Sequence, residues 1–275
     1  MALVPAERSP RWSDLRKRLV SAVILAPVVL VCLWHGGMAY HVMVIVAGLG
    51  LSLEWVHLRG DPPSSWPAIL VPLSVLTASI ATVYGQAQWG AAVLVVAAVA
   101  ARFTGRAGGG LAAMGIIYVG FGTLALLWLR DDALAGRINL LFVLLLIWAS
   151  DITAYLTGRL IGGPRLAPSI SPGKTWSGAA GGLAGAVAAA TILAFAVQPP
   201  ISMLWLLGIS IVLGIVAQLG DLLESRVKRQ FGVKDSGHLI PGHGGLLDRL
   251  DALLAAAPVA AMLALAAGRG VVLWQ

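Results

Sequence analysis

The amino-acid sequence predicts an all-α fold, a polytopic bundle of transmembrane helices whose N-terminus is cytoplasmic. Of the 275 residues, 59% are hydrophobic and only 11% are charged, and the apolar residues run together in long stretches. A soluble domain carries roughly 25% charged residues, and a membrane β-barrel shows short alternating segments instead of continuous runs. We therefore expect a single integral membrane domain over residues 1–275, with the lipid bilayer as its surroundings.

Long apolar stretches predict about nine membrane spans, because a hydrocarbon core about 30 Å thick needs about 20 apolar residues per helix. The predicted ranges are 18–35, 38–58, 67–84, 88–103, 111–130, 138–158, 176–197, 201–222 and 250–274. Residues 1–17 are expected to form an interfacial lead-in, since Trp12 and its basic neighbours suit the headgroup region.

The basic residues support this span count and orientation. With a cytoplasmic N-terminus, 16 of the 19 Lys and Arg residues fall on the cytoplasmic side, because only Arg130, Arg137 and Arg269 fall on the other. The net charge of +7 is then explained by contacts with lipid headgroups, so we expect no nucleic-acid partner. The single cysteine, Cys32, excludes an intrachain disulfide and a cysteine-based metal site.

Two connections are longer than the others, at 158–175 and 222–250, and both are predicted to be cytoplasmic loops. The span between them contains glycines spaced four residues apart, Gly178 with Gly182 and Gly181 with Gly185. This spacing lets helices approach closely. We expect it to serve packing within the chain, and a homodimer seam is the alternative.

Before the last span, three acidic residues lie within predicted spans, where an acid costs about 2.5–3.5 kcal/mol on insertion scales. Glu54 lies three residues before His57, and we interpret it as one half of an interfacial pair. Asp151 lies deeper, which favours a functional role over simple pairing with Arg159. Asp221 is predicted to end its span.

Asp248 and Asp251 open the last span three residues apart, so their carboxylates share one helix face. An antiparallel hairpin would bring Asp248 close to Asp221. Mg²⁺ prefers one or two carboxylates together with substrate phosphates, so we predict a magnesium site at Asp221 and Asp248. The alternative is surface salt bridging of these acids to Arg226 and Arg249.

Basic residues in both long loops predict a phosphate-rich ligand, since Lys and Arg beside carboxylates suit phosphate held through a metal. Glycines around His243 would let backbone N–H groups turn toward phosphate oxygens. A structural role for His243 is the alternative, and its spacing from His238 does not fit a zinc site.

The polar stretch 225–251 contains a long ungapped pattern. It consists of Ser225, Lys228, Arg229, Lys234, Asp235, Gly237, Ile240, Pro241, His243, Gly244, Gly245, Asp248, Arg249 and Asp251. This spacing resembles the signature of the bacterial phosphatidate cytidylyltransferases, or CDP-diacylglycerol synthases. Two upstream stretches agree, one around Ser150 and Asp151 and one ending in Lys174, Thr175 and Trp176. Ser177 departs from the family pattern, which has an acidic residue there.

The resemblance implies transfer of a cytidylyl group from CTP to phosphatidate, with Mg²⁺ as cofactor and a second cation left open. It implies a multi-pass protein of the bacterial inner membrane. Its active site would face the cytoplasm, formed by both long loops and the flanking helix ends. The implied catalytic residues are Asp221, Asp248, Lys228, Arg229 and Asp251, with Asp221 and Asp248 on the metal. The implied substrate-binding residues are Lys174, Ser225, Lys234, His243, Gly244, Gly245, Arg249 and Asp151.

Two other classes of protein compete with an enzyme. A transporter would place polar groups near the midplane and show internal repeats, whereas here the polar groups gather near one face. A phosphatidate-binding sensor or scaffold would explain the basic loops but not the clustered acids. The sequence therefore favours the enzyme.

Overall fold

The computed structural model describes residues 25–103, 109–237, 239, 244–268 and 270–275. Within these ranges the chain forms nine helices and one two-stranded sheet. The helices are Leu25–His35, α2 (Gly37–Leu58), α3 (Trp66–Val83), α4 (Ala87–Phe103), α5 (Gly109–Arg130), α6 (Gly136–Ile161), α7 (Trp176–Val197), α8 (Met203–Gln230) and α9 (Leu247–Ala267).

Each predicted span overlaps one of these helices, and α2, α3, α5, α6, α7, α8 and α9 are long and apolar enough to cross a membrane. The other two are shorter apolar helices, Leu25–His35 and α4. The predicted multi-pass helical membrane protein is therefore confirmed. The count of nine spans and the side of the N-terminus stay predictions, and the lead-in at 1–17 lies outside the described residues.

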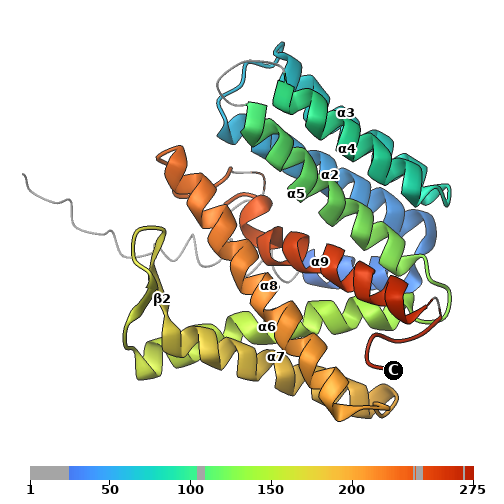
Figure 1. Cartoon of the computed structure of the whole chain (residues 1–275), viewed down its shortest axis with the longest axis vertical. Helices are drawn as coiled ribbons and strands as arrows, with labels where there is room; N and C mark the ends of the chain where they lie inside the picture. The colour runs from blue at the N-terminus through green and yellow to red at the C-terminus, as the bar shows by residue number, and fades with distance from the viewer. Residues whose placement is uncertain (1–24, 104–108, 238, 240–243, 269) are drawn as a thin grey trace, which may run out of the picture.

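Helices α2 to α5 pack together on one side of the molecule, α6 pairs with α7 on the other, and α8 and α9 lie between them (Figure 1). Buried Val71, Leu94 and Ile116 join α3, α4 and α5. Buried Phe142 and Leu213 join α6 and α8 in a second cluster. In lipid such contacts act through close van der Waals packing.

Helix α7 lies directly against α6 through its glycines. A Cβ atom on Gly181 would overlap the Thr157 side chain, and one on Gly185 would overlap that of Thr153. The hydroxyls of Thr153 and Thr157 donate to backbone carbonyls of α6. Neither threonine therefore leaves an unsatisfied donor where it packs against α7. The prediction that these glycines serve packing within the chain is confirmed.

The prediction of an all-α fold is wrong in the range 158–175, which we expected to be a loop. After α6 ends, strand β1 (Arg165–Ala167) pairs antiparallel with β2 (Ser171–Thr175). Gly162 and Gly163 adopt φ values of +66° and +102°, which end the helix and redirect the chain. The hairpin projects from the ends of α6 and α7 (Figure 1).

The range 222–250, also predicted to be a loop, is helical over its first residues because α8 continues to Gln230. Glu, Arg and Lys are good helix formers, and the polar side chains find partners within the protein. The helix ends where Gly232 adopts a φ of +70°. Asp221 therefore lies inside α8 and not at its end.

The last predicted span, 250–274, is too long at its C-terminal end. Helix α9 ends at Ala267, and Gly268 turns the chain with a φ of +95°. Trp274 is then fully buried, packs 5.1 Å from the Phe142 ring and donates its indole N–H to Gln198 O. The C-terminal residues of this predicted span therefore do not continue the helix. They fold back and pack against the bundle.

Candidate active site

A cavity of about 690 Å³ lies between α6, α7, α8 and the β-hairpin, and we call it the polar cavity because charged side chains stand in its wall. Its wall comprises Ser150, Asp151, Ala154, Tyr155, Gly158, Arg159, Arg165, Leu166, Gly173, Lys174, Thr175, Gly178, Ala179, Gln218 and Asp221. Acidic and basic side chains therefore meet in one hollow at the end of α6 that carries Arg159.

Lys174 and Asp221 form an ion pair in this cavity, with 2.5 Å between Nζ and Oδ2. Lys174 comes from β2 and Asp221 from α8. Asp151, on α6, interacts electrostatically with both. Asp251, on α9, does so too, and it also interacts with Asp151. The Lys174–Asp221 pair thus has two further carboxylates in its electrostatic surroundings.

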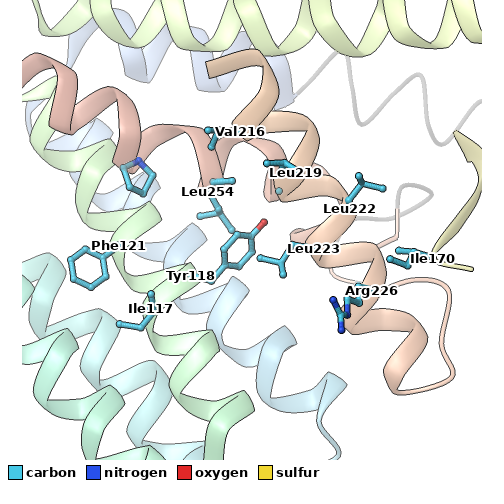
Figure 2. Close-up of a pocket in the computed structure, with 13 residues that line it drawn as sticks. Ile117, Tyr118, Phe121, Ile170, Val216, Leu219, Leu222, Leu223, Arg226 and Leu254 are labelled. Carbon is cyan, nitrogen blue, oxygen red and sulfur yellow. The ribbon is translucent and has the colours of Figure 1, made fainter. Parts of the chain in front are cut away.

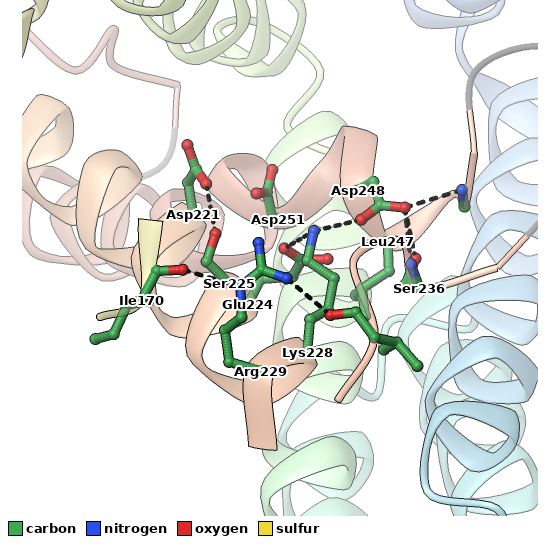
Figure 3. A network of polar contacts seen from close by, with 12 residues as sticks. Ile170, Asp221, Glu224, Ser225, Lys228, Arg229, Ser236, Leu247, Asp248 and Asp251 are labelled. Atoms are coloured by element: carbon green, nitrogen blue, oxygen red, sulfur yellow. Dashed lines mark hydrogen bonds and ion pairs between the residues drawn. The ribbon is translucent and has the colours of Figure 1, made fainter. Parts of the chain in front are cut away.

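Lys228 lies between two other acids, as Figure 3 shows. Its Nζ is 2.6 Å from Glu224 Oε2 and 2.5 Å from Asp248 Oδ1. The Glu224 side chain is only 1% exposed. Because a buried acid is costly without a partner, Lys228 is needed to neutralise this pair of carboxylates.

The second oxygen of Asp248 accepts three further hydrogen bonds. The Ser236 N–H, the Ser236 hydroxyl and the Gly245 N–H each lie 3.0 Å from Oδ2. Both oxygens of Asp248 are therefore occupied by the loop before α9 and by Lys228. Gly245 was predicted to offer its N–H to phosphate, and here it donates to Asp248.

Asp221 and Asp248 lie at the same end of the molecule but have different partners, and Asp251 lies between them in Figure 3. Among the described residues, no three His, Cys, Asp or Glu side chains are grouped closely enough to form a ready-made metal site. The magnesium site shared by Asp221 and Asp248 stays a prediction.

Arg229 and Ser225 are both held by nearby groups (Figure 3). Arg229 Nε donates to Ile170 O at 3.2 Å, and its Nη1 donates to Val233 O at 3.1 Å. Arg229 thus connects the tip of the hairpin to the end of α8. The Ser225 hydroxyl donates to Asp221 Oδ1 at 3.5 Å.

Of the remaining predicted residues, Lys234 and Gly244 lie in the connection between α8 and α9, and Arg249 lies in the first turn of α9. Lys234 and Arg249 are exposed. Gly244 adopts a φ of +84°, which favours glycine at this turn. His243 lies outside the described residues. Substrate contacts by these residues stay predictions.

Glu54 is a residue whose position the sequence did not predict. It is 4% exposed, and its carboxylate accepts the N–H groups of Leu246 at 2.8 Å and Leu247 at 2.7 Å. The interpretation of Glu54 as an interfacial pair with His57 is therefore wrong. The available signal was an acid within an apolar span, and this signal does not reveal the partner. Glu224 was missed for a different reason, because it falls in the polar range 222–250 that was predicted to be a loop and is helical.

An apolar groove of about 620 Å³ lies between α5, α8 and α9 (Figure 2). The α8 residues that line it differ from those that line the polar cavity. It is lined by Ile117, Tyr118, Phe121, Ile170, Val216, Leu219, Gly220, Leu222, Leu223, Arg226, Leu254, Ala255 and Pro258. The Tyr118 hydroxyl donates to Asp251 O at 2.6 Å, which joins the groove wall to the acidic cluster. Arg226 provides a positive charge in the groove wall.

The helical bundle, the carboxylate cluster and the adjoining apolar groove define an integral membrane protein with an ionic site at one end of its spans. The chain belongs to the cytidylyltransferase family, which matches residues 16–266. A phosphatidate cytidylyltransferase of Brucella abortus biovar 1 (strain 9-941) is 41% identical over 254 residues, or 89% of this chain and 91% of its own length. A protein of the same name from Bacillus subtilis (strain 168) is 40% identical over 149 residues, covering 54% of this chain and 55% of its own.

Proposed function

We propose that this protein transfers a cytidylyl group from CTP to phosphatidate, giving CDP-diacylglycerol and pyrophosphate. The observation that carries the proposal is the cavity in which Asp151, Asp221 and Lys174 meet, beside an apolar groove. This arrangement suits a reaction between a charged nucleotide and a lipid headgroup. Membership of the cytidylyltransferase family and the name of the Brucella relative support the same reaction.

In this reaction a phosphate oxygen of phosphatidate attacks the α-phosphorus of CTP. The new P–O bond forms as the bond to the β-phosphate breaks, and pyrophosphate leaves. Both reactants are anions, so catalysis depends on positioning and on neutralising charge. Lys174, Arg159 and Arg165 line the cavity and supply positive charge for the phosphates.

The residue types suit Mg²⁺, although among the described residues no three of these side chains are grouped closely enough to form a ready-made site. Asp151, Asp221 and Asp251 interact electrostatically with one another and with the single ammonium of Lys174. Carboxylates gathered in this way favour an added cation, and their oxygens are the ligands that Mg²⁺ prefers. Bound Mg²⁺ would neutralise charge on the phosphate oxygens.

In this proposal Asp221 and Asp251 hold the metal, and Asp151 is the remaining carboxylate available to a second cation. Asp248, the other predicted ligand, would first have to release Lys228, since its oxygens are already occupied. Its part in the proposal is to hold Lys228 and the loop before α9.

The apolar groove is proposed to take an acyl chain of phosphatidate, with Arg226 placed for the anionic headgroup. The distribution of basic residues supports a cavity facing the cytoplasm of a bacterial inner membrane. A homodimer would need a surface other than the glycine stripe of α7, since Gly181 and Gly185 are covered by α6.

The test uses the purified full-length protein in detergent micelles, with CTP labelled at the α-phosphate. Label is expected in CDP-diacylglycerol when phosphatidate is present, with one pyrophosphate released per product. Diacylglycerol in place of phosphatidate should give no labelled lipid, because it lacks the attacking phosphate. Folded protein that forms no labelled lipid from CTP and phosphatidate at any Mg²⁺ concentration would overturn the proposal.

A further inference from the structure

We propose that Glu54 is a positioning residue for the reaction: from α2 it binds the first amides of α9 and fixes the helix that carries Asp248 and Asp251. The inference rests on the proposed function for its catalytic consequence. Its structural part stands on the contacts of Glu54 alone.

Both carboxylate oxygens of Glu54 are engaged by α9 or by the loop before it. Oε1 accepts the Leu246 N–H at 2.8 Å, and Oε2 accepts the Leu247 N–H at 2.7 Å and the Ser236 hydroxyl at 3.4 Å. The first amides of a helix have no partner within the helix, and the N-terminus carries about half a positive charge. The buried carboxylate of Glu54, which comes from another helix, accepts these N–H groups and also balances this positive charge.

Glu54 shares the start of α9 with Asp248. Asp248 accepts the Gly245 N–H, and the next two amides go to Glu54. The Ser236 hydroxyl lies within hydrogen-bonding distance of both acids. The orientation of Asp248, and of Asp251 one turn later, therefore depends on a side chain nearly 200 residues earlier in the chain.

The glycines of the loop make room for this carboxylate. A Cβ atom on Gly237 would lie 2.8 Å from Glu54 Oε1, and one on Gly245 would lie 2.9 Å from Oε2 and overlap the Ser236 hydroxyl. Such contacts are too close for any side chain. Gly237 and Gly245 are therefore needed for the approach of the loop to Glu54, a role apart from any contact with phosphate.

Helix α2 is a firm support for Glu54. Its neighbour Trp55 is 1% exposed and donates its indole N–H to Leu111 O at 2.9 Å. Trp55 also packs so closely on Gly115 that no Cβ fits there. The contacts of Trp55 therefore hold this part of α2 against α5. A group that orients another helix needs such a rigid support.

The test compares Glu54→Gln with wild type in the full-length protein. The amide keeps the size of the side chain but offers one acceptor oxygen and places an NH₂ against an amide donor. Without ligands, hydrogen exchange of the amides at 244–249 should accelerate, while exchange in α3 and α4 stays unchanged. With CTP and phosphatidate, kcat should fall roughly 10- to 100-fold, and KM for CTP should change much less.

Asp61→Asn is the matched control, because Asp61 follows α2 and pairs with Arg59 outside the site. It should leave both exchange at 244–249 and kcat at wild-type values. Glu54→Asp keeps the charge but is one methylene shorter, so intermediate exchange and kcat are expected. If Glu54→Gln cannot be recovered folded, Glu54→Asp carries the test.

Wild-type exchange at 244–249 in Glu54→Gln, or in Glu54→Asp when that variant carries the test, would overturn the inference. So would wild-type kcat in the same variant. The exchange measurement needs no turnover. An inactive wild-type protein would therefore count against the proposed function, and the exchange result would still decide whether Glu54 fixes α9.

Discussion

Lys174 and Asp221 form an ion pair, 2.5 Å from Nζ to Oδ2, that joins the β-hairpin to α8. The pair places a cation from one long connection against a carboxylate that lies inside α8. Because both groups also line the polar cavity, the pair belongs to the proposed site and is not merely a surface contact.

Replacing Lys174 with Met is expected to lower kcat/KM for CTP by about 100-fold, because the cavity loses a group that neutralises phosphate charge. Stability should change little, since Lys174 and Asp221 are both partly exposed. The measurement is steady-state formation of CDP-diacylglycerol. Arg102→Gln removes an exposed charge at the end of α4 and should retain wild-type kinetics. Equal activity of Lys174→Met and wild type would show that this lysine does not act on substrate.

Asp221→Asn and Asp248→Asn should both abolish turnover, but only the second should also destabilise the fold. Asp221 interacts mainly within the open cavity, whereas Asp248 holds Lys228, Ser236 and Gly245. Loss of these bonds should cost about 1–3 kcal/mol. Thermal unfolding in detergent separates the two cases. A lower unfolding midpoint for Asp221→Asn than for Asp248→Asn would contradict this division of roles.

Lys228→Met is expected to be among the most destabilising single changes in the site. It leaves Glu224 and Asp248 together without their shared cation. Removing one partner of a buried ion pair costs about 3–5 kcal/mol. Glu224→Gln alone should cost less, and the double variant should recover part of the loss. A double-mutant cycle measured by unfolding tests this coupling, and additive effects would argue against it.

Gly181→Ala should destabilise the α6–α7 contact by about 1–3 kcal/mol, because overpacking forces the helices apart. The added Cβ would overlap Thr157 on α6. Since α6 carries Asp151, activity should fall along with stability. Gly208→Ala is the matched control, for Gly208 lies in α8 with no atom within 4 Å of its added Cβ. Equal unfolding midpoints for the two variants would show that the helices can separate without cost.

Much of the helix pattern could be predicted from the sequence, because each span needs a long apolar stretch. The predicted helix ends are wrong where a polar stretch is helical or an apolar stretch is not. Residues after Asp221 are polar yet helical, since the side chains of Glu224 and Lys228 pair inside the protein. Residues up to Trp274 are apolar, yet Gly268 ends the helix and the tail folds back.

The site could be predicted only in part. Asp151, Lys174 and Asp221 were expected in one site, and the cavity unites them. The partners of Asp248 could not be predicted, because Lys228 and Ser236 are as plausible for a substrate as for an acid. Glu54 could not be placed at all, since its hydrogen bonds to Leu246 and Leu247 join residues that are 192 and 193 positions apart.

Composition alone identifies the chain as a helical membrane protein, and the polar signature in residues 225–251 points to the family. Those properties depend on local composition and spacing, which need no knowledge of distant contacts. The partner of each acid, and the position of Glu54 at the start of α9, become visible only in the folded chain. Ion pairs and the capping of helix ends depend on distances of about 3 Å between segments far apart in the chain. A local sequence pattern does not predict such distances.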